Sequence, residues 1–321
     1  MPRRSTRRSL LLLTLLVPLG SPLGCGSSSS TSTPTPTPDT MLVHVIDPSS
    51  TDPAISSSFD SHQTFLETAV APNGKLLLFL PGTDAEPRAY QRLLAAAAAI
   101  GYHAIGLAYP NSESVATLCD GDPACYEPVR LEIFDGVDRS DRVSVDAANS
   151  IENRTVRLLQ YLAANFPNEG WDEFLANGAL RYGAITVAGH SQGGGEAAMI
   201  AKIRTVSRVA MFSAPIDAVD GVSAPWINTA NETPANRYFG FAHESDPAFA
   251  DIATNWQSLG MGSAADRVLV DNTAAPYGGA HQLETALSVS RPHNSTAVDS
   301  DTPTTLGQPI YRDVWRTVLG G

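Results

Sequence analysis

Residues 184–200 read Ala-Ile-Thr-Val-Ala-Gly-His-Ser-Gln-Gly-Gly-Gly-Glu-Ala-Ala-Met-Ile, with the serine at position 191. An apolar run, a glycine-rich turn and an alanine-rich stretch follow one another, so the order predicts strand, turn and helix. On so sharp a turn the Ser191 hydroxyl stands clear of the backbone, and the helix that follows points N–H groups toward it. Gly189 and Gly193 fit this geometry, because side chains there would collide where the strand folds back on the helix.

The flanking sequence alternates between apolar runs and helix-like stretches. Strands are expected at 75–80, 102–109, 184–188, 209–212 and 237–241, and helices at 88–100, 143–166 and 311–319. Continuous apolar strands that alternate with helices indicate an α/β fold, with a mostly parallel sheet covered on both faces. Residues 111–142 are irregular and Asp-rich, and we expect them to form a short insertion over the end of the sheet that carries the site.

Gly189-His-Ser-Gln-Gly193 resembles the nucleophile motif of the α/β-hydrolase superfamily, in particular of its serine esterase and lipase branch. The resemblance covers roughly residues 75–319. It implies an α/β-hydrolase fold with an eight-stranded, mostly parallel sheet, and a nucleophile, an acid and a histidine in that order along the chain. It also implies an ester-like substrate.

A second family feature is a loop that follows an early strand and supplies one N–H group to an oxyanion. Leu80-Pro-Gly-Thr83 follows its strand at the matching place, so Thr83 is one expected donor and Gln192 is the other. Two backbone N–H groups suit a tetrahedral oxyanion because they are fixed in place before the reaction begins.

The acid is expected just beyond the strand that follows 209–212. Asp246 stands there, directly before a proline, and its role would be to hold the tautomer of the catalytic histidine. Glu244, two positions earlier, and Asp217 are the competing carboxylates.

Two histidines compete for the role of general base. His293 follows the strand-like stretch 282–288, and residues 292–299 resemble the segment after the histidine of platelet-activating-factor-type hydrolases. His281 lies at the entry of the same stretch. The exits of parallel strands share the sheet edge that carries the serine, so we favour His293; if 268–270 is instead the last parallel strand, the two roles exchange. His190, beside the serine, is expected to pack or line the pocket.

The N-terminus has the layout of a secretory signal, with arginines up to Arg8, an apolar run at 10–17, and small residues up to Cys25. Residues 1–25 are therefore predicted to be a signal peptide with a lipobox-like end, which would anchor the chain to a membrane through lipidated Cys25. A Ser/Thr/Pro linker is expected at 26–40 and a single α/β-hydrolase domain at 41–321. The protein is predicted to be exported, facing the periplasm or the cell exterior, or else secreted.

Cys119 and Cys125 lie close together in a loop-like stretch, and an exported protein favours a disulfide between them. The formal charge of −12 argues against nucleic acid as a partner. No metal or other cofactor is expected, because the remaining histidines lack ligand spacing and Gly193-Gly-Gly195 lacks the Lys-Ser/Thr of a nucleotide-binding loop.

Together these features predict an enzyme that hydrolyses small carboxylic esters through an acyl-enzyme on Ser191, with Asp246 and His293 completing the triad. One alternative is a non-catalytic, surface-binding lipoprotein of the same fold, which would not react with a fluorophosphonate probe. The other is an acyltransferase or a peptidase, because both chemistries use the same three side chains.

Overall fold

The computed structural model describes residues 40–55 and 60–321, and these belong to one compact unit, Asp39–Gly321. The predicted signal peptide, Cys25 and all of the predicted linker except Thr40 lie outside the described residues. The first described strand, β1, begins at Met41.

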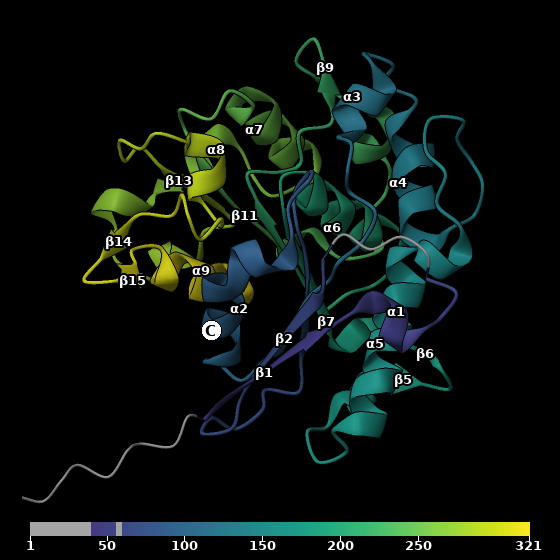
Figure 1. Ribbon diagram of the computed structural model, residues 1–321. Helices are drawn as coiled ribbons and strands as arrows, with labels where there is room; N and C mark the ends of the chain where they lie inside the picture. Colours follow the sequence, from purple (N-terminus) through teal and green to yellow (C-terminus); the bar gives the residue numbers. More distant parts are fainter. Residues whose placement is uncertain (1–39, 56–59) are drawn as a thin grey trace, which may run out of the picture. The chain divides into compact units, whose positions relative to one another are not determined.

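A large sheet runs through the domain (Figure 1). Within the described residues it has nine strands, in the spatial order β1 (Met41–Ile46), β2 (His62–Glu67), β4 (His103–Gly106), β3 (Leu76–Leu80), β7 (Ile185–His190), β8 (Arg208–Phe212), β11 (Tyr238–His243), β13 (Gln282–Thr285) and β12 (Arg267–Leu269). The β1–β2 and β2–β4 pairs are antiparallel, and every other neighbouring pair is parallel. Three two-stranded ribbons lie outside it: β5 (Leu175–Ala176) with β6 (Ala179–Leu180), β9 (Ala218–Val219) with β10 (Val222–Ser223), and β14 (Thr304–Thr305) with β15 (Gln308–Pro309).

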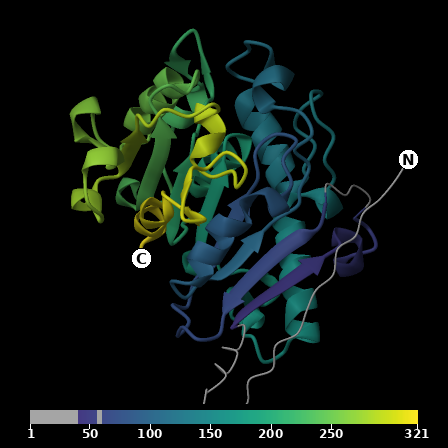
Figure 2. The ribbon, with the colours of Figure 1, turned by 60° about the vertical axis from the view of Figure 1, so that its left-hand side comes forward.

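Helices cover both faces of the sheet (Figure 1, Figure 2). One face carries α2 (Gln91–Ala98) and α9 (Arg312–Leu319), and the other carries α4 (Tyr126–Asp135), α5 (Ile151–Asn165) and α6 (Gln192–Ile203). The remaining α-helices are α1 (Pro48–Thr51), α3 (Val115–Cys119), α7 (Phe249–Ser258) and α8 (Pro292–Ser295). The structure thus confirms an α/β domain with a mostly parallel sheet.

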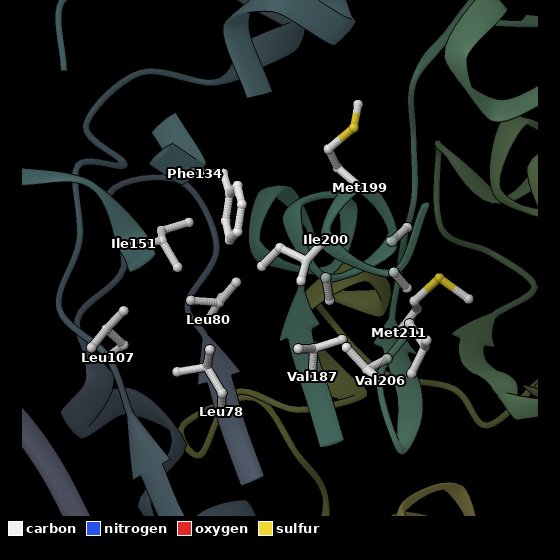
Figure 3. Close-up of a cluster of buried hydrophobic side chains, with 14 of the residues drawn as sticks. Leu78, Leu80, Leu107, Phe134, Ile151, Val187, Met199, Ile200, Val206 and Met211 are labelled. Carbon is white, nitrogen blue, oxygen red and sulfur yellow. The ribbon is translucent and has the colours of Figure 1, made fainter. Parts of the chain in front are cut away.

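Alternation along the central strands divides the apolar core into two layers. In β3, Leu78 and Leu80 point to the α5–α6 side, whereas Leu77 and Phe79 point to the α2–α9 side. Figure 3 shows the first layer, in which β3 side chains meet residues of β7, β8 and α6. Both faces of the central strands are buried, which is why β3 is apolar throughout and its neighbours β7 and β8 are largely apolar instead of alternating with polar residues.

The sheet differs from the eight strands that the family resemblance implies. A ninth strand, β12, lies at the edge beyond β13. The segments that form β1 and β2 were not expected as strands, and the reason lies in their sequence: β1 sits at the edge and exposes Val43 and Val45, while β2 buries the polar residues His62 and Gln63.

The segment 111–142 is not irregular, contrary to expectation. It contains α3 and the ten-residue helix α4, which packs against α5 and α6. Buried Val129 and Ile133 lie four residues apart on one face of α4, but the charged residues that alternate with them obscure the pattern. The Sγ atoms of Cys119 and Cys125 are 2.08 Å apart, so the predicted disulfide joins the end of α3 to the start of α4.

The helix expected at 143–166 is shorter, because α5 begins only at Ile151. Ser150 has extended backbone angles, and its side chain accepts a hydrogen bond from the Asn153 N–H group, which is the geometry of an N-cap.

Candidate active site

The serine turn connects β7 to α6. Ser191 follows His190, the last residue of the strand, and directly precedes Gln192, the first residue of the helix. Its φ of 53° and ψ of −119° lie in a region that residues with side chains rarely adopt. Such a backbone costs on the order of 1–3 kcal/mol and persists only where neighbouring contacts impose it, as at functional turns. Here the Ser191 N–H group donates to the Phe212 carbonyl oxygen of β8 at 2.9 Å.

Close backbone packing requires glycine on both sides of the serine. A Cβ atom at Gly189 would lie 2.2 Å from the carbonyl carbon of Gly193, which is the collision between strand and helix that the sequence predicts. A Cβ atom at Gly193 would instead lie 2.0 Å from the carbonyl oxygen of Leu80, at the end of β3. The serine turn is therefore packed directly against the strand that leads into the expected oxyanion loop.

Asp246 and His293 meet at the carboxyl ends of the parallel strands. Asp246 follows β11, and His293 lies in α8, which follows β13. The Asp246 Oδ2 atom accepts a hydrogen bond from His293 Nδ1 at 2.7 Å, and Oδ1 accepts one from the Ala248 N–H group at 2.9 Å. A carboxylate only accepts, so Nδ1 carries the proton and the neutral ring presents a bare Nε2. The Asp246 side chain is 1% exposed and the His293 side chain is 30% exposed, so the carboxylate is enclosed and the imidazole is accessible.

His281 lies at the other end of the strands, where β11 begins. Its Nδ1 atom is 2.7 Å from the carbonyl oxygen of Tyr238, the first residue of β11, and its ring stacks on Phe239 with 4.3 Å between centroids. Of the two candidate histidines, His293 is thus the one bonded to a carboxylate, and β13 rather than the edge strand β12 leads to it.

The two competing carboxylates lie elsewhere. Glu244 is exposed. Asp217 is completely buried and accepts hydrogen bonds from Arg130 Nε and Nη2, both at 2.6 Å, and from Trp226 Nε1 at 2.9 Å. Among the three candidates, only Asp246 bonds to His293.

The expected oxyanion donors lie next to each other. The Thr83 hydroxyl donates to Gln192 Oε1 at 2.8 Å. Within residues 40–55 and 60–321, neither the Thr83 nor the Gln192 backbone N–H group donates to a protein acceptor. Both groups are therefore free to bind an oxygen of a ligand. A Cβ atom at Gly82 would lie 3.3 Å from the Ser191 Cβ atom, so the loop that carries Thr83 approaches the serine closely.

Buried polar side chains hold the expected oxyanion loop, which carries Thr83, in place. Tyr109 donates from its hydroxyl to the Pro81 carbonyl oxygen at 2.8 Å. Asn111 Nδ2 donates to the carbonyl oxygens of Gly82 at 2.6 Å and Ala85 at 2.9 Å. Because both side chains follow β4, this neighbouring segment fixes the loop backbone.

The Ser191 hydroxyl is half-buried and makes no hydrogen bond to any residue that the structure describes. The geometry therefore joins the acid to the base and places the serine at the same sheet edge, without a direct bond from Ser191 to His293. In sites without substrate such bonds are often long, and they tighten when substrate binds.

No protein-family model and no curated protein matches the chain.

A buried ion cluster lies beneath the serine turn. Arg130 of α4 forms an ion pair with Asp217. Its Nη1 atom donates hydrogen bonds to Glu196 Oε1 at 2.8 Å and to the Gln192 carbonyl oxygen at 3.2 Å. Arg130 is 1% exposed, and Glu196 and Asp217 are completely buried. Burial raises the pKa of Glu196 to about 8, although the nearby guanidinium opposes this shift. At neutral pH Glu196 is then an uncharged carboxylic acid, and the positive charge of Arg130 is balanced by the Asp217 carboxylate.

His243 holds the turn that leads to Asp246, a role that the sequence analysis did not assign to it. Its Nδ1 atom accepts from the Ser245 N–H group at 3.0 Å, and its Nε2 atom lies 2.7 Å from the Leu287 carbonyl oxygen. The only available signal is that His243 ends a strand just before the acid. Tyr109, Asn111 and Arg130 likewise support the site, and nothing in their local sequence marks them.

Among the described residues, no group of three or more His, Cys, Asp or Glu side chains could hold a metal ion. No helix within that part of the chain is long and apolar enough to cross a membrane.

Proposed function

We propose that this protein is a serine hydrolase that cleaves carboxylic esters through an acyl-enzyme on Ser191. The observation that carries the proposal is the 2.7 Å bond from His293 to buried Asp246, at the sheet edge where Ser191 occupies a strained turn. That bond fixes Nδ1 as the donor, so in the neutral ring the free lone pair is on Nε2, as a general base requires.

The proposal includes the α/β-hydrolase fold. In the sheet, the antiparallel pairs β1–β2 and β2–β4 precede a run of parallel strands. The serine, acid and histidine follow β7, β11 and β13 in the family's order. The edge strand β12 is an addition to the eight strands of the family.

The reaction begins when His293 Nε2 takes the Ser191 proton and Oγ attacks the ester carbonyl. The negative charge on the carbonyl oxygen is met by the N–H groups of Thr83 and Gln192, and losing one such donor costs about 3 kcal/mol of barrier. His293 then gives its proton to the departing alcohol. Water, deprotonated by the same Nε2 atom, attacks the acyl-enzyme, and Ser191 recovers its proton as the carboxylic acid leaves.

We propose further that the enzyme is exported and held at a membrane by a lipid on Cys25, with residues 26–40 as the spacer. The basic and apolar leader before Cys25 supports this proposal. Intact mass and detergent partitioning of the protein from cells test it, and a Cys25→Ser variant that still partitions into detergent contradicts it.

Hydrolysis of p-nitrophenyl esters of graded chain length tests the catalytic proposal. Ser191→Ala should lose turnover and fluorophosphonate labelling while keeping the melting temperature within a few degrees. Ser300→Ala, at an exposed serine, is the matched control and should behave as wild type. A wild-type protein that folds but is neither labelled nor active would instead favour the non-catalytic binding lipoprotein.

A further inference from the structure

A chain of buried hydrogen bonds connects the oxyanion loop to the loop that carries the base. The Gly82 N–H group is 3.1 Å from the Tyr90 hydroxyl, which is 3.1 Å from His190 Nδ1. On the other side of the imidazole, His190 Nε2 is 3.0 Å from the His293 carbonyl oxygen. Tyr90 is completely buried and His190 is 3% exposed, so water does not compete for these bonds.

The chemistry of the groups fixes the direction of every bond. The His293 carbonyl oxygen can only accept, so His190 Nε2 carries a proton. In the neutral ring Nδ1 is then an acceptor, and the Tyr90 hydroxyl must donate to it. The Tyr90 oxygen in turn accepts from the Gly82 N–H group. All four groups are satisfied in one arrangement, with each donor pointing from the oxyanion loop toward the base.

Only the neutral ring of His190 fits this arrangement, because a protonated Nδ1 could not accept from Tyr90. Burial, followed by the nearby His293, lowers the pKa of His190 to about 3. The ring therefore keeps one tautomer at neutral pH.

The contacts leave little room for adjustment. A Cβ atom at Gly82 would lie 3.0 Å from His190 Nδ1. The His190 and His293 rings are 5.0 Å apart between centroids, and the Ser213 hydroxyl donates a second hydrogen bond to the His293 carbonyl oxygen at 2.8 Å. A shift of the His190 ring would consequently displace the oxyanion loop, the base loop, or both.

We propose that Tyr90 and His190 are positioning residues that fix the distance between the oxyanion donors and the general base. The proposal rests on the proposed function, since it assigns these two residues to the placement of that same site. Neither side chain takes part in a proton transfer. The residue before the serine thus holds two loops in register rather than lining the pocket.

Tyr90→Phe is the sharpest test, because it removes one oxygen and keeps the ring. Tyr102→Phe is the matched control: Tyr102 is also a buried tyrosine, and its hydroxyl donates to the Leu319 carbonyl oxygen at 2.6 Å, near the opposite edge of the sheet. Fluorophosphonate incorporation counts the competent sites, and rapid-mixing kinetics with p-nitrophenyl acetate give acylation and deacylation rates per site.

Tyr90→Phe should slow both steps about tenfold per labelled site with little change in KM, because misplacement weakens the base and the oxyanion donors together. Tyr102→Phe should lower the melting temperature by a similar amount without slowing either step. A purely structural role for Tyr90 would lower the number of labelled sites and leave the rate of each site unchanged.

A second pair of variants tests His190 and serves if Tyr90→Phe fails to fold. His190→Gln retains an amide N–H group that can reach the His293 carbonyl oxygen, whereas His190→Leu has none. The proposal predicts that the rate per labelled site is at least tenfold higher for His190→Gln than for His190→Leu. Equal rates for these two variants, or a Tyr90→Phe rate within twofold of wild type, would overturn it. Failure of the proposed function is distinct, because then wild type itself would show no labelling at Ser191.

Discussion

The Thr83 hydroxyl donates a hydrogen bond to the side-chain oxygen of Gln192 across 2.8 Å, joining the two residues to which we assign the oxyanion. Thr83→Val keeps the shape and the backbone N–H group but removes this bond. We expect kcat for p-nitrophenyl esters to fall several-fold with KM nearly unchanged, because the two donors are less firmly held. Thr83→Ser keeps a hydroxyl and should retain most of the rate. Equal kcat values for Thr83→Val and wild type would show that the side-chain bond is dispensable.

The two candidate histidines should separate cleanly in kinetics. His293→Ala removes the ring bonded to Asp246 and should lower kcat by at least about 10³-fold. His281→Ala removes a bond to a backbone oxygen at the opposite edge of the sheet, and should cost about 1–2 kcal/mol of stability with little change in kcat. Steady-state kinetics and urea unfolding of both variants check this. A nearly active His293→Ala enzyme would rule out our assignment of the base.

Steric crowding at Gly193 makes a substitution there costly. In Gly193→Ala the new Cβ atom would lie 2.0 Å from the Leu80 carbonyl oxygen, so the serine turn or the end of β3 must move. We expect loss of activity and a lower melting temperature. Gly183→Ala is the control, because a Cβ atom at Gly183 meets nothing within 4 Å. Thermal unfolding and esterase assays on both variants should show a large difference between them.

The buried carboxyl of Glu196 predicts how stability depends on pH. The folded protein keeps this group protonated up to about pH 8, whereas in the unfolded chain it ionises near its ordinary pKa of 4.5. Unfolding between these values releases a proton, so the free energy of unfolding should fall as pH rises, by about 1.4 kcal/mol per pH unit for this one group.

Glu196→Gln removes that ionisation and should flatten the curve of unfolding free energy between pH 5 and pH 8. Urea unfolding at several pH values measures the effect, with Glu232→Gln, at an exposed glutamate, as the control. Curves of the same slope for wild type and Glu196→Gln would contradict the assignment of a neutral Glu196.

The disulfide closes a short loop between α3 and α4 and should stabilise the protein by up to about 3 kcal/mol. Cys119→Ser with Cys125→Ser should therefore unfold at a lower urea concentration than wild type under oxidising conditions. With reductant present, the two proteins should become similar. Intact mass before and after reduction gives an independent check, and two freely alkylated thiols in the exported protein would refute the bridge.

The serine turn could be predicted from sequence because its constraints are local. Gly189 and Gly193 flank the serine within five residues, and the contact that requires Gly189 lies within the turn itself, although the one that requires Gly193 is with Leu80 of β3. The order of strands and the family resemblance point to Thr83, Asp246 and His293, whereas no local pattern indicates the hydrogen bond between Asp246 and His293, which lie 47 positions apart.

What could not be predicted depends on contacts distant in sequence. Tyr90 and His190 are separated by 100 positions, and no local pattern indicates that their side chains meet. Helix α4 was missed for a related reason: Arg130 is charged, so it reads as a solvent-facing residue unless its partner Asp217, 87 positions later, is known. The burial and pairing of polar residues whose partners are distant in sequence therefore cannot be predicted from a single sequence.

Arg130 also limits how freely segments of this protein could be exchanged. Its guanidinium is the cation that neutralises the Asp217 carboxylate and donates to Glu196 beneath the serine turn, yet it belongs to the segment inserted between β4 and α5. A chimaera in which another insert replaced this segment would leave the Asp217 carboxylate buried without a counterion, at a cost of about 3–5 kcal/mol, and Glu196 Oε1 without its donor. The insert is thus not freely interchangeable, and exchanging it would require Glu196 and Asp217 to be exchanged with it.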